Sequence, residues 1–242
     1  MMVRADVELF VGRVENELVP FVEKLLSTTC GAPAAEAAKE CIEIGVEQLR
    51  GDAMPRLTAA LVAAVVERCL EALKQLKGIT ATFRMTNKPL PTRHSHFVPG
   101  ILAPLRAFVD SDRAKALTPA SRTELALSVS DGVSTRYAEM AGELVTTVKK
   151  TEASLNRLKD RKAGKAGAAA GGGGATASAA TKAGGADGKI SDTDKICKQL
   201  HLDVCEYGAQ LAKLGVDPKE RETFKALWAT AAPEGEPMPA SF

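Results

Sequence analysis

Apolar residues recur at every third or fourth position through residues 119–162, which is the spacing of one face of an α-helix. After Pro119 the segment contains no proline, so no residue removes a backbone N–H that a helix needs there. The apolar face comprises Leu125, Val129, Val133, Tyr137, Met140, Leu144, Val148, Thr151, Leu155 and Leu158. The pattern predicts one long amphipathic helix.

Three shorter amphipathic helices are predicted upstream of the long one. The first covers residues 7–25 and contains Pro20, which is expected to kink or divide it. A second helix follows and is expected to run to about Leu49, with a break at Gly51. Asp52 is expected to cap the third helix, and Gly78 is expected to end it by adopting a left-handed conformation.

Two segments lack a helical pattern. Residues 80–99 hold three prolines among polar residues and predict a connector, followed by a short apolar helix over residues 97–108. Residues 163–190 are almost entirely Ala, Gly, Ser, Thr and Lys. Nine glycines in this stretch make a continuous helix unfavourable, so a flexible linker is predicted.

A helical hairpin is predicted over residues 191–230. Ser191 and Asp194 form a capping box at its start, and Gly215 ends its first helix. Two short helices cannot bury both of their apolar stripes alone, so the hairpin is expected to dock on the rest of the chain or on a partner.

These elements predict an all-α fold: a helical bundle or rod with a long central helix, a disordered Ala/Gly linker and a C-terminal helical hairpin. The expected divisions are an N-terminal bundle portion (1–79), a connector plus the long helix of the same bundle (80–162), the linker (163–190), the hairpin (191–230) and a disordered tail (231–242).

Composition narrows the class of protein. Apolar residues make up 45% of the chain and aromatic residues only 4%, which favours an aliphatic core of packed helices. The formal net charge of +2 and the lack of a basic face with stacking aromatics argue against nucleic-acid binding. The five cysteines are scattered and odd in number, which is typical of free thiols in the cytosol. Neither a signal peptide nor a membrane span is apparent, so any membrane association is expected to be peripheral.

Candidate chemistry is sparse. Cys197, His201 and Cys205 recur at every fourth position, so they share one helix face and could begin a zinc site, but no fourth ligand is evident. His94 and His96 lack further ligands nearby. The sequence holds no nucleophile elbow and no phosphate-binding loop. We therefore expect no enzyme activity, no bound metal and no cofactor.

A basic segment marks the end of the long helix. It consists of Lys149, Lys150, Arg157, Lys159, Arg161, Lys162 and Lys165, against only Glu152 and Asp160. Cations suit a helix C-terminus and a solvated face, and this is the favoured interpretation. The alternative is a patch that attracts anionic lipid or an acidic partner.

Three blocks, in this order, resemble a known family. They are FRMTNKPLPTRHSHFV (83–98), STRYAEMAGELVTTVKKTEASLNRLK (134–159) and SDTDKICKQLHLDVCEYGAQLAKLG (191–215). Together they are similar to the C-terminal part of subunit 2 of the conserved oligomeric Golgi complex. Members of that family are longer, and their N-terminal coiled-coil region has no counterpart here, which indicates a truncated or short form.

The resemblance implies a subunit of a tethering complex on the cytosolic face of the Golgi membrane. Such a complex captures vesicles in retrograde intra-Golgi transport together with SNAREs, Rab GTPases and coiled-coil tethers, and its subunits are rods of helical bundles. The resemblance supplies no catalytic residues.

We therefore predict non-catalytic tethering through helix faces, by contact with the other subunits of the Golgi complex. The side chains expected to act as packing or partner anchors are Tyr137, Met140, Leu144, Phe224 and Trp228. Two alternatives remain at this point. One is a cytosolic helical adaptor or coiled-coil scaffold outside Golgi traffic, and the other, less favoured, is a helical metalloprotein that uses Cys197, His201 and Cys205.

Overall fold

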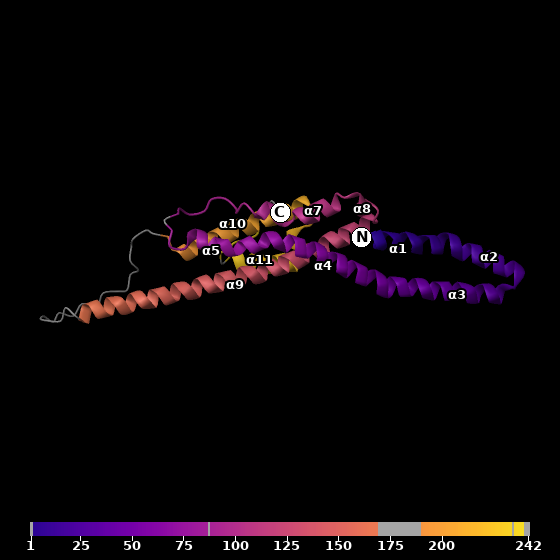
Figure 1. Ribbon diagram of the computed structural model, residues 1–242, viewed down its shortest axis with the longest axis horizontal. Coiled ribbons are helices and arrows are strands. Elements are labelled where there is room, and N and C mark those ends of the chain that lie inside the picture. Colours follow the sequence, from indigo (N-terminus) through magenta and orange to yellow (C-terminus); the bar gives the residue numbers. More distant parts are fainter. Residues whose placement is uncertain (1, 87, 169–189, 234, 240–242) are drawn as a thin grey trace.

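The computed structural model describes residues 2–86, 88–168, 190–233 and 235–239. Helices form nearly all of these residues, and no strand occurs among them, which confirms the predicted all-α fold. The helices lie side by side in an elongated rod (Figure 1). Most of the predicted Ala/Gly linker, residues 169–189, lies outside the described residues.

Two antiparallel helices form a hairpin at one end of the rod. Its first arm consists of α1 (Met2–Arg13), the π-helical turn η1 (Val14–Leu18) and α2 (Val19–Thr29). The chain then reverses at Gly31, whose φ of 91° suits glycine, and continues as α3 (Ala32–Gln48). Pro20 is the second residue after the π-helical turn. Because proline has no N–H to donate, the wider turn before it lets the helix continue.

The same arrangement joins the hairpin to the rest of the rod. A second π-helical turn, η2 (Leu49–Ala53), precedes Pro55 and leads into α4 (Met54–Leu73), η3 (Lys74–Lys77) and α5 (Gly78–Phe83). The predicted break at Gly51 and the predicted end at Gly78 are therefore both wrong.

The reason is energetic. A glycine inside a helix costs only about 1 kcal/mol, which packing of the neighbouring turns offsets. Gly78 has an ordinary helical φ of −71°. Asp52 does not cap a new helix, and its carboxylate pairs with Arg56 at 2.9 Å. The chain leaves the helical conformation only after α5, where Met85 has a φ of 54°.

Three short helices connect α5 to the long helix. They are α6 (Val98–Ile101), α7 (Ala103–Val109) and α8 (Asp112–Lys115). The single helix predicted over residues 97–108 is thus divided at Leu102, next to Pro104. The long helix, α9 (Pro119–Ala168), extends six residues beyond its predicted end at residue 162.

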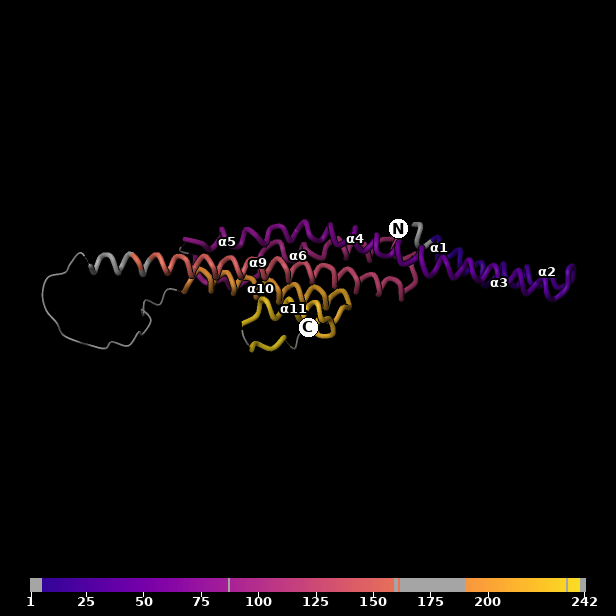
Figure 2. Tube along the Cα trace, turned by 90° about the horizontal axis from the view of Figure 1, so that it is seen from below, coloured from indigo at the N-terminus to yellow at the C-terminus, as the bar shows by residue number. Residues whose placement is uncertain are grey.

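The C-terminal hairpin consists of α10 (Asp192–Lys213), the short turn η4 (Pro218–Glu220) and α11 (Glu222–Ala231). Ser191 caps α10, and its Oγ accepts a hydrogen bond from the backbone N–H of Asp194 at 3.0 Å. Gly215 follows the helix with a φ of 75°. Both helices pack on α9, as Figure 2 shows from below.

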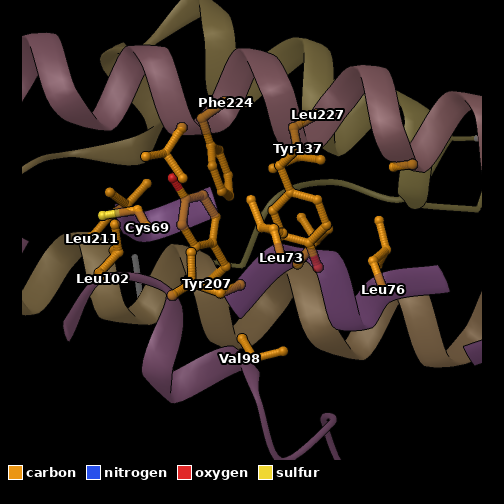
Figure 3. Packing of buried hydrophobic residues seen from close by; sticks show 14 of the residues in the cluster. Cys69, Leu73, Leu76, Val98, Leu102, Tyr137, Tyr207, Leu211, Phe224 and Leu227 are labelled. Atoms are coloured by element: carbon orange, nitrogen blue, oxygen red, sulfur yellow. The ribbon is translucent and has the colours of Figure 1, made fainter. Parts of the chain in front are cut away.

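The buried apolar side chains form two separate clusters. The larger is formed by side chains of α4, α6, α7, α9, α10 and α11, and Figure 3 shows part of it from close by. The smaller belongs to the N-terminal hairpin and contains only Val11, Val14 and Val46 as fully buried members. Along the chain, the two clusters are separated between Leu49 and Leu61, a stretch that includes η2. The expected division of the chain at residue 79 stays a prediction.

The described part of the C-terminal tail lies against the body of the rod. The indole Nε1 of Trp228 donates a hydrogen bond to the carbonyl oxygen of Glu236 at 3.1 Å, and Met238 packs on the large cluster. Residues 235–239 thus differ from the disordered tail that was expected over residues 231–242.

A close approach of α4 and α9 yields a first prediction. A Cβ at Gly132 would lie 3.0 Å from Cγ2 of Val66, whereas a Cβ at Gly142 would meet nothing nearer than 3.8 Å. Gly142→Ala should therefore raise the free energy of unfolding by about 0.5–1 kcal/mol through helix propensity. Gly132→Ala should raise it less or lower it, and Gly132→Leu should lower it by about 1–3 kcal/mol. Urea unfolding measures all three, and equal gains from both alanines would contradict the close contact.

Candidate functional site

An aromatic group joins the three helices of the C-terminal half. Tyr137 of α9 meets Tyr207 of α10 edge to face, with ring centroids 5.5 Å apart, and Tyr207 stacks on Phe224 of α11 at 6.2 Å. The Tyr207 hydroxyl lies 3.0 Å from Oγ of Ser134. All three rings are fully buried (Figure 3). Tyr137 and Phe224, two of the predicted anchors, therefore lie in the core, where no partner reaches them without opening the fold.

The other predicted anchors lie closer to the surface. Met140 and Leu144 are half-buried on α9 and pack against the large cluster. Trp228 is 6% exposed and contacts the His201 ring edge to face at 5.2 Å. Contact of these side chains with a partner stays a prediction.

A buried carboxylate ties the connector between α5 and α6 to α10. Asp203 accepts hydrogen bonds from the backbone N–H and from the hydroxyl of Ser95, the latter at 2.7 Å, and from Nε2 of Gln199 at 2.9 Å. Gln199 also donates to the carbonyl oxygen of Arg93. One turn of α10 thus orders a proline-rich segment more than 100 residues earlier in the sequence.

Asp203 is fully buried, and this burial raises the pKa of its carboxyl group above the ordinary 3.8, although the hydrogen bonds from Ser95 and Gln199 oppose the shift. Sequence analysis missed this residue. The available signal was a charged residue seven positions after Ile196 and four before Tyr207, inside the apolar stripe of α10. A buried carboxylate needs hydrogen-bond donors, and only Gln199 lies nearby in sequence, whereas both donors of Ser95 are 108 positions away.

A second polar contact joins α11 to α9. Asp131 accepts hydrogen bonds from Arg221 and from Oγ1 of Thr223, the latter at 2.7 Å. Burial tends to raise the pKa of the Asp131 carboxyl, but the hydrogen bonds from Arg221 and Thr223 outweigh it, so the pKa is lowered. The ion pair between Asp131 and Arg221 therefore joins the start of α11 to α9.

The row of candidate zinc ligands is only partly assembled. Cys205 Sγ lies 3.6 Å from Nε2 of His201, and burial raises the pKa of both the Cys197 and the Cys205 thiols. A raised thiol pKa disfavours the thiolate that binds zinc. Within the described chain, no group of three or more His, Cys, Asp or Glu side chains is arranged to hold a metal ion. His94 and His96 are both exposed on either side of Ser95.

The surroundings of His201 are those of a packed core histidine. Its Nε2 lies 3.4 Å from Oε1 of Glu236 in the C-terminal tail, and its Nδ1 is buried without a hydrogen-bond partner among the described residues. Burial lowers the pKa of His201, and Glu236 opposes this effect. The histidine therefore holds the tail against α10 and α11.

Exposed apolar side chains gather at the two ends of the rod. At one end, α9 continues past the C-terminal hairpin (Figure 1), with Leu158 59% exposed and Leu155 44% exposed, near the cations Arg157 and Arg161. At the other end, the N-terminal hairpin exposes a row of leucines and phenylalanines. Among the described helices, none is long and apolar enough to cross a membrane.

The fold and these surfaces define an all-helical rod whose polar groups are used in internal ties and whose free apolar side chains lie on helix faces. The chain belongs to the family of conserved oligomeric Golgi complex subunit 2, because the family model for "COG complex component, COG2, C-terminal" matches residues 1–204.

Individual relatives agree with this assignment. Conserved oligomeric Golgi complex subunit 2 of Arabidopsis thaliana is 35% identical over 229 residues, which cover 94% of this chain and 28% of the relative. The subunits of the same name from Drosophila melanogaster and Homo sapiens are 31% and 30% identical, over 68% and 72% of this chain and 21% and 22% of their own length. The chain thus spans less than a third of the relatives it matches. No solved structure matches it significantly.

The Asp203 contact yields a second prediction. Asp203→Ala removes the acceptor of both Ser95 donors and one of the two acceptors of Gln199 Nε2, so it should lower the free energy of unfolding by about 2–4 kcal/mol. Asp203→Asn keeps one acceptor and removes the titration. Urea unfolding at several pH values measures both effects, with the exposed Asp110→Asn as control.

The sign of the pH effect follows from the raised pKa. The folded protein holds the Asp203 proton to a higher pH than the unfolded chain does, so wild-type stability from this group is greatest below the ordinary pKa of about 4 and falls as pH rises through the folded-state pKa. The Asp203→Asn variant has no carboxyl group that loses a proton here. The difference between its free energy of unfolding and that of wild type should therefore become smaller as pH rises through the folded-state pKa. If the difference in free energy of unfolding between the two proteins does not change with pH, the pKa of Asp203 is not raised in the folded protein.

Proposed function

We propose that this chain serves as a non-catalytic part of a Golgi vesicle-tethering complex, and that it acts in retrograde intra-Golgi transport and Golgi organisation through contacts between helix faces. Family membership carries the proposal, because the relatives are named as subunits of the conserved oligomeric Golgi complex. The cytosolic face of the Golgi membrane is the proposed location, with peripheral rather than integral attachment.

The shape of the rod supports a bridging role. The 50 residues of α9 give a helix about 75 Å long, since each residue adds about 1.5 Å. Its N-terminal part is fixed by the packed body, and its C-terminal part extends away from that body (Figure 1). Several weak contacts spread along such a rod combine into strong attachment when they engage together.

The proposed partners are first the other subunits of the complex, and then SNAREs, Rab GTPases and coiled-coil tethers. The extended end of α9 suits an acidic helical partner or anionic lipid headgroups, because Leu155 and Leu158 supply apolar contact and Lys149, Lys150, Arg157 and Arg161 supply exposed positive charge.

A third prediction concerns partner capture. A tagged form of this chain, expressed in cells that contain the whole complex, should co-purify with the other Golgi-complex subunits and localise to the Golgi. A cytosolic adaptor outside Golgi traffic would capture none of them. Mass spectrometry of the captured proteins separates the two hypotheses, and absence of every other subunit from the wild-type sample would overturn the proposal.

Two variants distinguish a loss of partner contact from a loss of folding in that experiment. The double change Leu155→Asp and Leu158→Asp affects exposed side chains, so the melting temperature should stay within about 2 °C of wild type while capture falls severalfold. Leu144→Asp places a charge against the large cluster and should cost about 2–4 kcal/mol of stability. If both variants retain wild-type capture and stability, neither position acts as an anchor.

A further inference from the structure

The connector between α5 and α6 runs along the outside of the body (Figure 1), yet it is held in place at both ends. At its start, the backbone N–H of Met85 donates a hydrogen bond to Oδ2 of Asp192 at 2.8 Å. At its end, the carbonyl oxygen of Arg93 accepts a hydrogen bond from Nε2 of Gln199 at 2.9 Å, next to the Asp203 contact described above. Helix α10 therefore fixes both ends of an exposed segment.

Between these contacts, residues 88–94 form neither helix nor strand. Pro89 and Pro91 each restrict φ to about −65° and steer the preceding residue toward extended backbone. Every residue of this stretch is exposed except Pro91, which is half-buried. None of its backbone N–H groups donates a hydrogen bond to a described residue. The stretch is therefore ordered by contacts at its ends and largely open to solvent between them.

The connector also lies in the longest stretch of the chain without an acidic residue. Residues 72–109 contain six lysine and arginine residues and neither aspartate nor glutamate. Lys88 and Arg93 flank the two prolines and are exposed, and no carboxylate of the described residues lies within ion-pair distance of either. Asp192 and Asp203, which do contact the connector, accept hydrogen bonds from its backbone. The positive side chains are therefore free to pair with another molecule.

A groove on α10 borders the second half of this stretch. One wall consists of Thr92, Arg93 and His94, and the tail contributes Pro239. The remaining lining residues belong to α10 and are Leu202, Cys205, Glu206 and Ala209. A molecule that binds the connector can therefore extend its contact onto the helix beside it.

We propose that residues 88–94 are a preformed recognition segment, which another subunit of the complex binds in a groove lined by carboxylates and aromatic side chains. Aromatic rings pack on prolines in extended backbone, and carboxylates pair with Lys88 and Arg93. Because α10 already fixes the recognition segment, binding does not have to order it. This inference rests on the proposed function, since it takes the partner from the tethering complex.

The same role explains why a carboxylate is buried at position 203. An apolar side chain in the stripe of α10 would pack there without the loss of hydration that a buried charge suffers. The hydrogen bonds that Asp203 accepts from Ser95 instead hold the end of the recognition segment. The buried charge thus contributes order to an exposed part of the chain.

A protein groove fits the recognition segment better than a membrane surface does. Seven residues of extended chain span about 22 Å, at about 3.1 Å per residue, and present backbone N–H groups that need directional acceptors. A groove supplies such acceptors at fixed positions. Leu90 is the one large apolar side chain of the segment, and it is only 39% exposed, which offers little area for insertion into a bilayer.

Capture of the complex by the tagged full chain tests the charge of the segment. In cells that contain the whole complex, Lys88→Glu with Arg93→Glu should lower capture of at least one subunit by about fivefold or more, because the reversed charges repel carboxylates. The contact of Arg93 with Gln199 uses the backbone carbonyl, so this change leaves it in place. Lys24→Glu with Lys213→Glu, at exposed positions on α2 and α10, alters net charge equally and should leave capture unchanged.

A second variant tests the preformed backbone. Pro89→Ala with Pro91→Ala keeps every charge but removes the restriction on φ, so it should lower capture by about threefold. The melting temperature of each variant should stay within about 2 °C of wild type, because the altered side chains lie at the surface. A photoreactive benzoylphenylalanine at position 90 should cross-link to the affected subunit, at a peptide with acidic and aromatic residues.

The possible results separate this inference from the proposed function. If wild type captures the complex and the Lys88 and Arg93 reversal captures it equally well, or if the Lys24 and Lys213 control loses as much, the inference is wrong and the proposed function stands. A wild-type chain that captures no subunit overturns both. Flotation with phosphatidylserine vesicles tests a membrane: binding that the Lys88 and Arg93 reversal abolishes, with capture of the complex unchanged, would assign the segment to lipid and overturn the inference.

Discussion

The structure depends on the burial of one apolar stripe along α9. Leu125, Val129, Val133 and Tyr137 are nearly inaccessible to solvent, and Ala141 and Val148 extend the same face. None of the neighbouring helices could hold its own apolar stripe away from water by itself, because most of the stability of a helix in a protein comes from packing of its apolar face. Helices α4, α7, α10 and α11 instead pack on α9, which α4 approaches closely at Gly132. The long helix is therefore the element on which the others assemble.

Proline imposes the second constraint on the rod, and the chain meets it twice in the same way. Pro20 and Pro55 each lie shortly after a five-residue π-helical turn. A proline in a helix interior removes one backbone hydrogen bond and crowds the preceding turn, at a cost of about 3 kcal/mol. The wider turn relieves this crowding, so the two arms of the hairpin stay helical and the second arm runs on into α4. The hairpin thereby joins the body through continuous helix.

The sequence predicted those features that depend on nearby residues. The stripe of α9 and the Ser191 cap both follow from spacing of a few positions. It failed at Gly51 and Gly78, because contacts with distant helices compensate for the low helix propensity of glycine. It also missed Asp203, whose donor Ser95 lies 108 positions away. The two anchors that lie deepest, Tyr137 and Phe224, were identifiable as large apolar residues, but their burial by α10 was not.

The distribution of polar contacts supports the proposed tethering role. In the body, the half-buried Asp131 pairs with Arg221, and the buried Asp203 accepts hydrogen bonds from Ser95, so these carboxylates hold separate segments of the chain together. Satisfied groups of this kind have little capacity left for a ligand. The apolar side chains at the two ends of the rod have no such internal use. Their exposure to water is unfavourable in free energy, and contact with another helix face removes that cost without any change of fold. Association at the ends of the rod is therefore favoured by the same force that assembles its centre.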